Sequence, residues 1–546
     1  MKPTRPRSLP TRNSARRGVA LAALVAVVTA CGTTHATASY TAVPSATMAP
    51  TPWSSSTVAP TVGPTAAPTP VPTPQGVTFP IAVVVRYDDD RPNITAAALT
   101  AAAASGDLVV PCEVTGLSLG GQALTLATNA TCLPADQIAA RIHATARTVG
   151  LLPPGLVSPS VKVLPVGEAD LFGAPTHRAL SYPLLAEVTN ETAGAVEWTA
   201  YDVNDVRTLI STGDTCPDRG VSMMAVTKGK GWDWTLAGGS VRYAGFHMDT
   251  QYSGPQGKGW PVPNLRRGSD SGTMAALISD NDVSANDFEC PLLAGWTQHN
   301  SGMVFTIDPR VAQLLATKGG VKVVTLGSNH ITNGGRAGVL ETLKYLDAAG
   351  IKHTGAGKNL ADALAPAVVD VRGLKFAFVG WDDIQGSAAA TTKPGVAPMT
   401  DANVCSSIKA ARQVADIVIA MPQWGWPEYH STITKEQIAQ RAYFYQCGAD
   451  GILGSGTHWA SWASILSGPN GPQFAIGSHG NFLFDQNWSQ QTMEGVVVEV
   501  TFVGTRLAQF RLHPYVVVQG AQPNLLDPLA DGKYVLQRVW SVSDVR

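Results

Sequence analysis

The sequence is short of charge and of the features that mark nucleic-acid-binding or membrane-spanning proteins. Only 14% of its 546 residues are charged, and the formal net charge is −1. No extended basic tract occurs beyond the first seventeen residues, so the electrostatic footprint of a nucleic-acid-binding protein is missing. The N-terminal apolar run from Val19 to Val28 is too short to span a bilayer. With 45% hydrophobic residues, the chain can still form two folded domains with tails.

The cysteines lack the CxxC spacing of zinc sites, which argues against a cysteine metal site or a thiol nucleophile. One of the seven cysteines, Cys31, belongs to the N-terminal segment described in the next paragraph, which leaves six. An even set in an exported chain predicts three disulfides. Pairing of neighbours along the chain is the simplest connectivity, and the sequence alone leaves the others open. The six disulfide candidates are Cys112, Cys132, Cys216, Cys290, Cys405 and Cys447.

The N-terminus has the pattern of an export signal. Six basic residues and no acidic ones precede the apolar run, which ends in "VTAC" at Cys31. This ending resembles the lipobox of bacterial lipoproteins, so residues 1–31 are expected to include a signal peptide cleaved before Cys31, which would then be acylated. The alternative is an ordinary cleavage site beside an incidental cysteine, and the choice between Sec and twin-arginine export stays open. The expected location is the outer face of the bacterial cell membrane, with a lipid anchor.

Residues 32–76 are expected to form a disordered stalk. No Lys, Arg, Asp or Glu occurs between Gly32 and Val85, and Thr, Pro, Ala and Ser dominate up to Gln75. This composition cannot bury a core and favours extended polyproline-like chain. Such a stalk would hold a folded domain away from the membrane, as suits a protein that works within or beyond a cell-wall layer.

Residues 77–229 are expected to form a small α+β domain of unknown role. The strand-like stretches "FPIAVVVRY" and "DLVVPCEV" are separated by an alanine-rich helical stretch, and "ADQIAARIHATARTVG" has helical spacing. The acidic run from Tyr87 to Asp90 lacks the regular ligand spacing of calcium loops, which favours a solvated turn. We find no chemical signature in this segment.

Residues 232–518 alternate predicted strands and helices, followed by a C-terminal extension at 519–546. "VKVVTL", "LKFAFVG" and "DIVIAM" have the composition of buried strands. Thr434 and Gln437 have the spacing of a capping box that opens a helix, and Gly448 is expected to end it. This alternation predicts an α/β layer fold, whose sites lie at the carboxyl ends of strands.

Polar clusters occur at each of these predicted strand ends. In chain order they are "GGSV" (238–241), "ANDFECPL" (285–292), "GSNHITNGG" (327–335), "QWGWPEY" (423–429), "GSGTH" (454–458) and "GSHGNFLFD" (477–485). Their order and spacing resemble the CapA family of capsule or poly-γ-glutamate synthesis proteins. The resemblance implies a layered α-β-β-α fold of the calcineurin-like metallophosphatase type, and it covers over half of the chain.

The resemblance also implies a set of site residues. His330 and Glu428 match positions expected to be catalytic, and the expected metal or ligand contacts are Asn286, Glu289, Asn329, His330 and His458. Trp424 is expected to pack in the core, whereas the role of Trp426 stays open.

Several positions depart from the family pattern. Ser240 stands where the first motif has a metal-bridging aspartate, Asn333 replaces an aspartate, and Gln423 replaces a histidine. Ser455 and Gly456 replace two further histidines. Because serine, glutamine and glycine supply neither the charge nor the basic nitrogen of a dinuclear site, these departures predict an eroded metal centre.

Nearby residues offer substitutes for the missing ligands. These are His247, Asp249, His430 and His479. The leading hypothesis is therefore a surface lipoprotein that takes part in the synthesis or anchoring of capsule, poly-γ-glutamate or another envelope polymer, with a divalent metal (Mn, Zn or Fe) at reduced occupancy or none. The alternative is an active metal-dependent phosphoesterase or other hydrolase with a rearranged ligand set. A solute-binding lipoprotein is a third possibility. The expected partners are the polymer and the membrane, without nucleic acid, and the oligomeric state stays open.

Overall fold

A computed structural model describes residues 76–545 apart from 200, 255–256, 385 and 426. The predicted signal, the lipidation site at Cys31, the stalk and Trp426 lie outside the described residues. The described part belongs to one compact unit. None of its helices has the length and apolar character that crossing a membrane requires.

The first domain is α+β, as predicted, and contains two small sheets with helices α1 (Ala96–Ser105) and α2 (Ala135–Ala144). One sheet has the strand order β1-β9-β4-β5, with bounds Val77–Pro80, Leu184–Val188, Val114–Leu119 and Gln122–Ala123. The other has the order β6-β3-β7-β2-β8, with bounds Thr131–Leu133, Leu108–Pro111, Val149–Leu152, Ala82–Arg86 and Val161–Leu164. This domain has its own core, an apolar cluster that includes Val83 of β2 and Leu99 of α1, whereas the cluster that packs α2 on β2 also contains Ala508 of the second domain.

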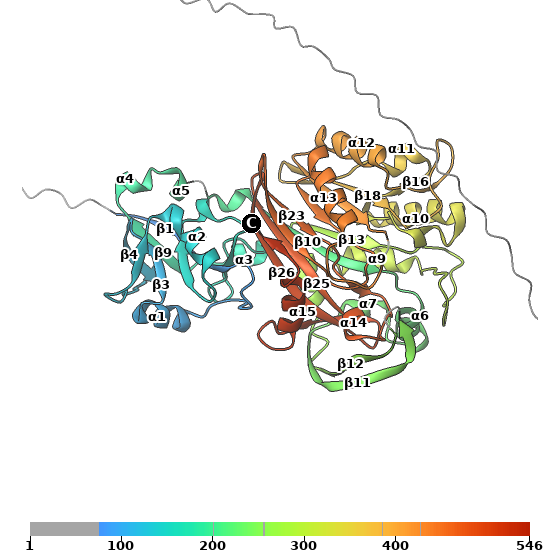
Figure 1. Cartoon of the computed structure of the whole chain (residues 1–546), viewed down its shortest axis with the longest axis horizontal. Helices are drawn as coiled ribbons and strands as arrows, with labels where there is room; N and C mark the ends of the chain where they lie inside the picture. The colour runs from blue at the N-terminus through green and yellow to red at the C-terminus, as the bar shows by residue number, and fades with distance from the viewer. Residues whose placement is uncertain (1–75, 200, 255–256, 385, 426, 546) are drawn as a thin grey trace, which may run out of the picture. The chain divides into compact units, whose positions relative to one another are not determined.

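The second domain is built on a ten-stranded and a seven-stranded sheet (Figure 1). The ten-stranded sheet runs β12-β11-β27-β26-β25-β10-β13-β14-β15, and β24 pairs with β10. In the same order their bounds are Gly257–Arg267, Ser240–Gly254, Gln522–Leu526, Arg506–Val518, Glu494–Val503, Val206–Thr215, Val283–Phe288, Val323–Thr325 and Lys352–Thr354, with β24 at Asn481–Leu483. The seven-stranded sheet runs β17-β18-β20-β21-β23-β22-β28. Its bounds are Ala367–Val371, Leu374–Asp382, Ile417–Gln423, Gly451–Leu453, Gly471–Ile476, Ala463–Gly468 and Asp544–Val545.

Three apolar clusters show how the layers stack. One contains side chains of both sheets, such as Val498 from β25 and Phe376 from β18, so it fills the space between them. A second packs the other face of the ten-stranded sheet against α7 (Trp232–Leu236), α8 (Thr273–Ser279), α9 (Arg310–Thr317) and α10 (Gly335–Ala349). A third packs the seven-stranded sheet against α12 (Asp401–Arg412) and α13 (Lys435–Cys447). The domain is therefore a layered α-β-β-α sandwich, as predicted.

Local sequence signals account for several elements of this sandwich. The capping box of α13 is confirmed, because the Thr434 hydroxyl accepts from the Gln437 N–H and the Gln437 side chain accepts from the Thr434 N–H. Gly448 ends the helix at a φ of 114°, a left-handed conformation that favours glycine. Trp424 is buried and stacks on Phe444, so its predicted packing role is also confirmed.

Two of the predicted domain limits differ from the sheet topology. Strand β10 lies within the segment expected to belong to the first domain, yet it pairs with β25 and β13 in the middle of the ten-stranded sheet. Residues 519–546, expected to form an extension, supply β27 and β28 to the two sheets and α15 (Gly532–Trp540) to the core between them. Both segments pair with strands distant in sequence, which local periodicity cannot reveal.

The disulfides connect neighbouring cysteines, so the simplest predicted connectivity is confirmed. Cys112 pairs with Cys132, Cys216 with Cys290, and Cys405 with Cys447. The first lies in the α+β domain, the second links the ends of β10 and β13, and the third joins α12 to α13.

A buried charge network connects the first domain to the ten-stranded sheet. The Arg511 guanidinium of β26 lies 2.5 Å from the Asp170 carboxylate and 3.5 Å from that of Glu499, and it donates to the Val163 carbonyl of β8. His513 lies 2.7 Å from Glu499. Burial alone would raise the pKa of Glu499, but the Arg511 charge and the His513 hydrogen bond lower it to about 2.

Because the pKa of Glu499 is lower in the folded protein than its ordinary 4.5, its contribution to stability is fully present above pH 4.5 and declines as the pH falls toward 2. We expect Glu499→Gln to lower the free energy of unfolding by about 3 kcal/mol at pH 7. Urea unfolding at pH 7 and pH 3.5 measures this loss, which should shrink at the lower pH. The exposed Glu436→Gln serves as the control, and an equal loss at both pH values would contradict the assignment.

Candidate metal centre

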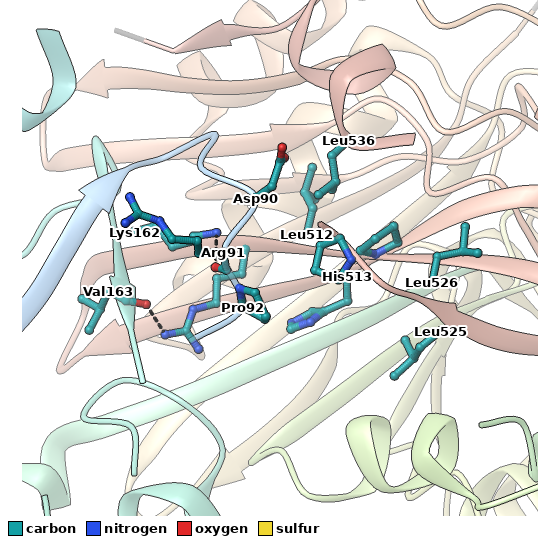
Figure 2. Close-up of a pocket in the computed structure, with 13 residues that line it drawn as sticks. Asp90, Arg91, Pro92, Lys162, Val163, Leu512, His513, Leu525, Leu526 and Leu536 are labelled. Atoms are coloured by element: carbon teal, nitrogen blue, oxygen red, sulfur yellow. Dashed lines mark hydrogen bonds between the residues drawn. The ribbon is translucent and has the colours of Figure 1, made fainter. Parts of the chain in front are cut away.

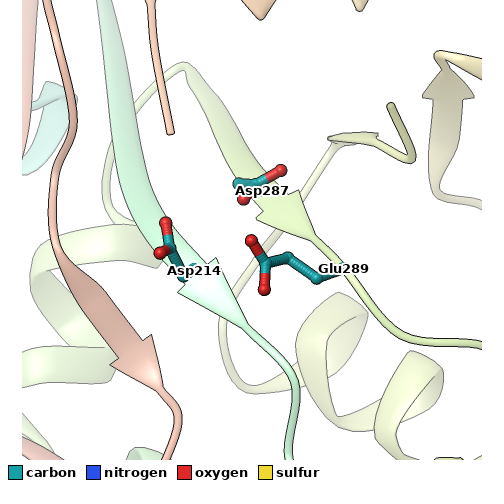
Figure 3. Close-up of side chains that lie close together, drawn as sticks. All are labelled: Asp214, Asp287 and Glu289. Atoms are coloured by element: carbon teal, nitrogen blue, oxygen red, sulfur yellow. The ribbon is translucent and has the colours of Figure 1, made fainter. Parts of the chain in front are cut away.

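Three buried carboxylates meet at the ends of two parallel strands (Figure 3). Asp214 lies at the end of β10, Asp287 pairs with it from β13, and Glu289 follows β13 directly. One oxygen from each carboxylate lies within 4.8 Å of the others. Their side chains belong to residues that are 0%, 3% and 0% exposed, respectively. Asp214, Asp287 and Glu289 are called the acidic triad below.

The acidic triad has no lysine or arginine partner in the described part of the chain. Neither carboxylate oxygen of Asp287 or Glu289 accepts a hydrogen bond there. Burial raises the pKa of both groups well above the ordinary range, and the charge of Asp214 raises it further. Three closely spaced buried acids are stable in the ionised form only with a compensating cation, and carboxylate oxygens suit divalent metals. The triad therefore fits a divalent metal ion.

Backbone contacts bring the two strand ends close together. A Cβ atom on Gly213 would lie 2.0 Å from the Gly480 carbonyl oxygen, so only glycine permits this approach of β10 to the segment before β24. Asn286 donates from its amide to Thr212, Gly213 and Thr215 on β10. Since neighbouring strand residues point to opposite faces, Asn286 supports β10 while Asp287 joins the triad. Asn286, predicted as a metal or ligand contact, thus bonds the neighbouring strand, and the next residue faces the triad.

His458 extends the site from the acidic triad. Its Nδ1 lies 3.0 Å from Oδ2 of Asp214 and 2.9 Å from Oδ1 of Asn481. Burial acts to lower the pKa of His458, but hydrogen bonding to Asp214 and the charges of Asp214 and Glu428 raise it overall. His458 and Tyr429 stack on each other and have positive φ values of 57° and 58°. Two non-glycine residues held in this disfavoured backbone region are typical of a functional site.

A cleft of about 430 Å³ adjoins these residues. Its lining includes the predicted site residues His330, Glu428 and His458, together with Arg219 and Asp249. Burial raises the pKa of Glu428, which favours its protonated form more than in water. The Arg219 guanidinium pairs with Asp485 and lies 4.8 Å from the centre of the Phe305 ring.

The third and fourth motifs also meet here. The side-chain amide of Gln423 donates to Oδ1 of Asn329 at 3.1 Å. The side-chain oxygen of Gln423, Oε1, has no hydrogen-bond partner in the described chain. His330 lies 3.2 Å from the Asn333 side chain and against the Phe305 ring. Burial lowers the pKa of His330 to about 4, so the imidazole is neutral at pH 7 and available as a ligand or base.

Among the four substitute ligands, His479 is the best placed. It is 2% exposed, its Nδ1 lies 3.1 Å from the Gly454 carbonyl, and its Nε2 has no hydrogen-bond partner in the described chain. Burial lowers its pKa to about 4, while the charge of Asp214 opposes that shift. Asp249 lines the cleft, but His247 contacts Asn264 on the exposed hairpin and His430 contacts the Thr432 carbonyl.

The expectation that Ser240 occupies the place of the first-motif aspartate is wrong. Ser240 begins β11, where its carbonyl accepts from Gly268. The Gly-Asp pair that ends the first strand of the site is instead Gly213 and Asp214 in "LISTGDT". The dipeptide itself was the available signal. It was missed because the buried strand before it contains Arg207 and several hydroxyl residues, unlike an apolar core strand.

A second cavity, of about 220 Å³, lies between the first domain and β26 (Figure 2). Its charged lining is largely engaged within the protein, since Arg511 pairs with Asp170 and Lys162 donates to the Arg91 carbonyl. Burial lowers the pKa of Lys162 to about 8. Among the described residues, no buried carboxylate without a partner lines this cavity, in contrast to the acidic triad.

The layered fold and the buried strand-end acids together define a domain with a candidate divalent-metal centre. Residues 208–486, just over half of the chain, match the family described as "Bacterial capsule synthesis protein PGA_cap". The chain belongs to this family, which confirms the CapA resemblance. The matched range begins inside β10, so it includes Asp214.

Two curated relatives are named CapA. The chain is 29% identical to "Capsule biosynthesis protein CapA" of Bacillus anthracis over 235 residues, 41% of this chain and 56% of the relative. It is 28% identical to "PGA biosynthesis protein CapA" of Bacillus subtilis (strain 168) over 195 residues, 35% of this chain and 50% of the relative. The chain thus spans about half the length of the curated relatives it matches.

Similar solved structures include a calcineurin-like phosphoesterase, YfkN from Bacillus subtilis, with 11% identity and a TM-score of 0.32 over 61% of this chain and 98% of that one. A 5'-nucleotidase precursor from Thermus thermophilus has 13% identity and a TM-score of 0.33 over 61% of this chain and 57% of that one. Because both TM-scores are low, the site is described from the contacts given above and not from these two structures.

Glu289→Gln provides a direct test of the acidic triad. A raised carboxyl pKa means that metal-free protein loses stability as the pH rises above the ordinary value of 4.5, because folding then keeps a proton that the unfolded chain releases. We expect the variant without metal to be more stable than wild type at pH 8, and the difference to shrink as the pH falls toward 4.5. Calorimetry in EDTA measures this difference.

In the same experiment, MnCl₂ should raise the melting temperature of wild type and leave that of Glu289→Gln nearly unchanged. Glu436→Gln, which changes an exposed carboxylate on α13, should respond as wild type does. A Glu289→Gln protein that is destabilised without metal and keeps the full response to Mn²⁺ would exclude the acidic triad as the metal centre.

Proposed function

We propose that this protein is an exported, CapA-like surface lipoprotein that acts on a capsule or other envelope polymer through a divalent-metal centre. The observation that carries the proposal is the buried acidic triad at the strand ends of a capsule-synthesis family domain, where the Asp287 and Glu289 oxygens lack hydrogen-bond partners among the described residues. Asp214, Asp287 and Glu289 would hold the ion, with His458 beside Asp214.

The neutral residues around the triad favour a single ion over a pair. Gln423 and Ser455 stand where the family resemblance calls for histidines, and Asn333 stands for an aspartate. The three carboxylates of the acidic triad would hold the first ion. A second cation would then have His479, His330 and neutral amide oxygens near it, with no carboxylate of the triad left to bind it. A bound divalent ion supplies charge stabilisation to a phosphoryl or carbonyl oxygen of the substrate.

The residues of this chain supply the remaining functions of the site. Glu428, with its raised carboxyl pKa, can hold a proton in the cleft for donation to a leaving group. His330 is neutral and can accept a proton or a hydrogen bond. The Arg219 guanidinium at the cleft wall pairs with Asp485, so attraction of an anionic polymer such as poly-γ-glutamate or a phosphate-linked glycan would come from the bound cation. These roles favour metal-assisted hydrolysis or transfer on an anionic polymer.

Binding without turnover is the second candidate, favoured by the same neutral substitutions at Gln423 and Ser455. In that case, the cleft would hold polymer while the ion stabilises the site. The protein would then scaffold or anchor the polymer, as the eroded-site hypothesis holds.

Metal analysis combined with a phosphodiester assay and a poly-γ-glutamate binding assay tests the proposal. We expect about one transition-metal ion per chain, lost in Asp214→Asn and kept in Asp233→Asn, an exposed control on α7. If turnover occurs, Asp214→Asn should reduce kcat/KM by at least about 100-fold. A chain that binds no metal would overturn the metal centre. Two ions with turnover abolished by His330→Ala would favour the dinuclear alternative.

The lipid anchor has its own test. Replacing Cys31 with serine should release the protein from the membrane fraction into the medium or periplasm, because acylation of that thiol would be the attachment. Fractionation of wild-type and Cys31→Ser cells, with Cys112→Ser/Cys132→Ser as the control, measures the distribution. Unchanged membrane association of Cys31→Ser would overturn the anchor.

A further inference from the structure

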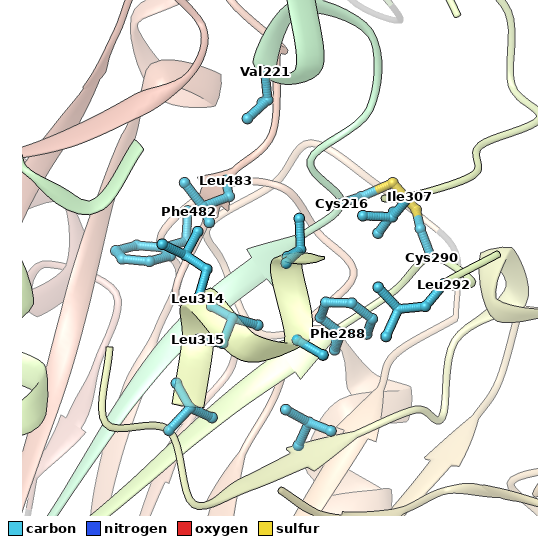
Figure 4. Packing of buried hydrophobic residues seen from close by; sticks show 14 of the residues in the cluster. Cys216, Val221, Phe288, Cys290, Leu292, Ile307, Leu314, Leu315, Phe482 and Leu483 are labelled. Atoms are coloured by element: carbon cyan, nitrogen blue, oxygen red, sulfur yellow. A yellow bond between two sulfur atoms is a disulfide. The ribbon is translucent and has the colours of Figure 1, made fainter. Parts of the chain in front are cut away.

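The Cys216–Cys290 disulfide lies immediately beyond the acidic triad. Cys216 is two residues after Asp214, and Cys290 directly follows Glu289. The two Cα atoms are 5.2 Å apart. Figure 4 shows the bond at the ends of the two strands, beside Ile307 and Leu292. The bond therefore joins the two backbone segments that carry all three carboxylates.

The backbone ladder is irregular at this same point. The register between β10 and β13 shifts between Thr212 and Asp214, and the pairing ends at Thr215 with Phe288. Beyond it, the Glu289 N–H donates to the Thr215 carbonyl at 3.0 Å. An irregular ladder near its end resists separation less than a regular one, since fewer regular hydrogen bonds hold the strands together.

The acidic triad pushes these strand ends apart when its carboxylates are ionised. Like charges in a buried setting repel strongly, and no lysine or arginine of the described chain is paired with these three groups. A cation needs the three oxygens at fixed short distances before it binds, so separation of the strand ends would lower its affinity. Holding the ligands in place before binding reduces that cost.

Both cysteines are rigidly embedded. They are 3% and 0% exposed within the apolar cluster that also contains Phe288 and Phe305. The Cys216 N–H donates to the Leu483 carbonyl of β24 at 3.0 Å. The disulfide thus ties three strand ends to a packed core, and displacement of one end would disturb the others.

From these contacts we infer that the Cys216–Cys290 disulfide is a positioning element for the acidic triad and sets its affinity for a divalent cation. This inference rests on the metal centre proposed above. Oxidation of Cys216 and Cys290 to the disulfide therefore completes the high-affinity cation site. Of the three disulfides in the described structure, this is the one whose cysteines adjoin the triad.

The Cys405–Cys447 bond provides a matched control. It closes a loop with a sequence separation of 42 residues, against 74 for Cys216–Cys290, so loss of either should destabilise the fold to a similar extent. It joins α12 to α13 in the apolar cluster on the outer side of the seven-stranded sheet. The two variants are Cys216→Ala/Cys290→Val and Cys405→Ala/Cys447→Val, with apolar replacements because both sites are apolar.

Isothermal titration with MnCl₂ on the purified full chain gives the dissociation constant, and the Mn²⁺ electron paramagnetic resonance spectrum reports the symmetry of the bound ion. We expect Cys216→Ala/Cys290→Val to bind Mn²⁺ at least about tenfold more weakly, with an altered spectrum. The Cys405→Ala/Cys447→Val control should keep the wild-type constant and spectrum at a similar melting temperature. That difference separates positioning from a general loss of stability.

If the first variant does not fold, folded Cys112→Ala/Cys132→Val/Cys405→Ala/Cys447→Val protein, which keeps Cys216–Cys290, is titrated before and after reduction in its native state, and weaker Mn²⁺ binding by the reduced form is then the expected result. Equal Mn²⁺ constants with and without the Cys216–Cys290 bond, in a chain that binds Mn²⁺, would overturn this inference alone. Absence of Mn²⁺ binding by wild type would overturn the metal centre and this inference together.

Discussion

The central constraint on this structure is the burial of three carboxylates side by side without a lysine or arginine of the described chain to neutralise them. Folding alone gains nothing from such a cluster, because desolvation and mutual repulsion both oppose it. The surrounding contacts hold it in place all the same: Gly213 against Gly480, the Asn286 amide on β10, and His458 on Asp214. A site maintained against its own electrostatics is typical of function, and the rest of the strand-end architecture follows from it.

Much of the cleft could be predicted from motif order. Asn329, His330, Glu428 and His458 come from three separate segments, and the structure brings them to one region because their strands end at the same edge of the layered fold. The acidic triad was only partly predictable. The sequence predicts Glu289 as a site residue, but it predicts Asn286 in place of Asp287. Side chains alternate between the two faces of β13, and the sequence alone does not show which face is turned toward the site.

The layers themselves followed from local signals, such as the capping box of α13 and the apolar runs of β18 and β20. The limits of the second domain did not. Strand β10 carries polar side chains at buried positions, including Arg207, which donates to the carbonyl of Val371 across the two sheets. Such residues need partners far away in sequence as well as near ones, so a local pattern assigns them to a loop. The same reason hid Asp214, although its dipeptide motif is plain in the sequence.

The Arg511 network has a practical meaning for how the chain can be divided. The family match covers residues 208–486, which suggests a separable module. That range omits β26, β27 and α15, and hence the strand that carries Arg511. A fragment that kept β26 but lacked the first domain would leave Arg511 without Asp170 and the Val163 carbonyl. The smallest piece of this protein suited to recombinant work is therefore the whole described region, 76–545, rather than the part that homology alone would outline.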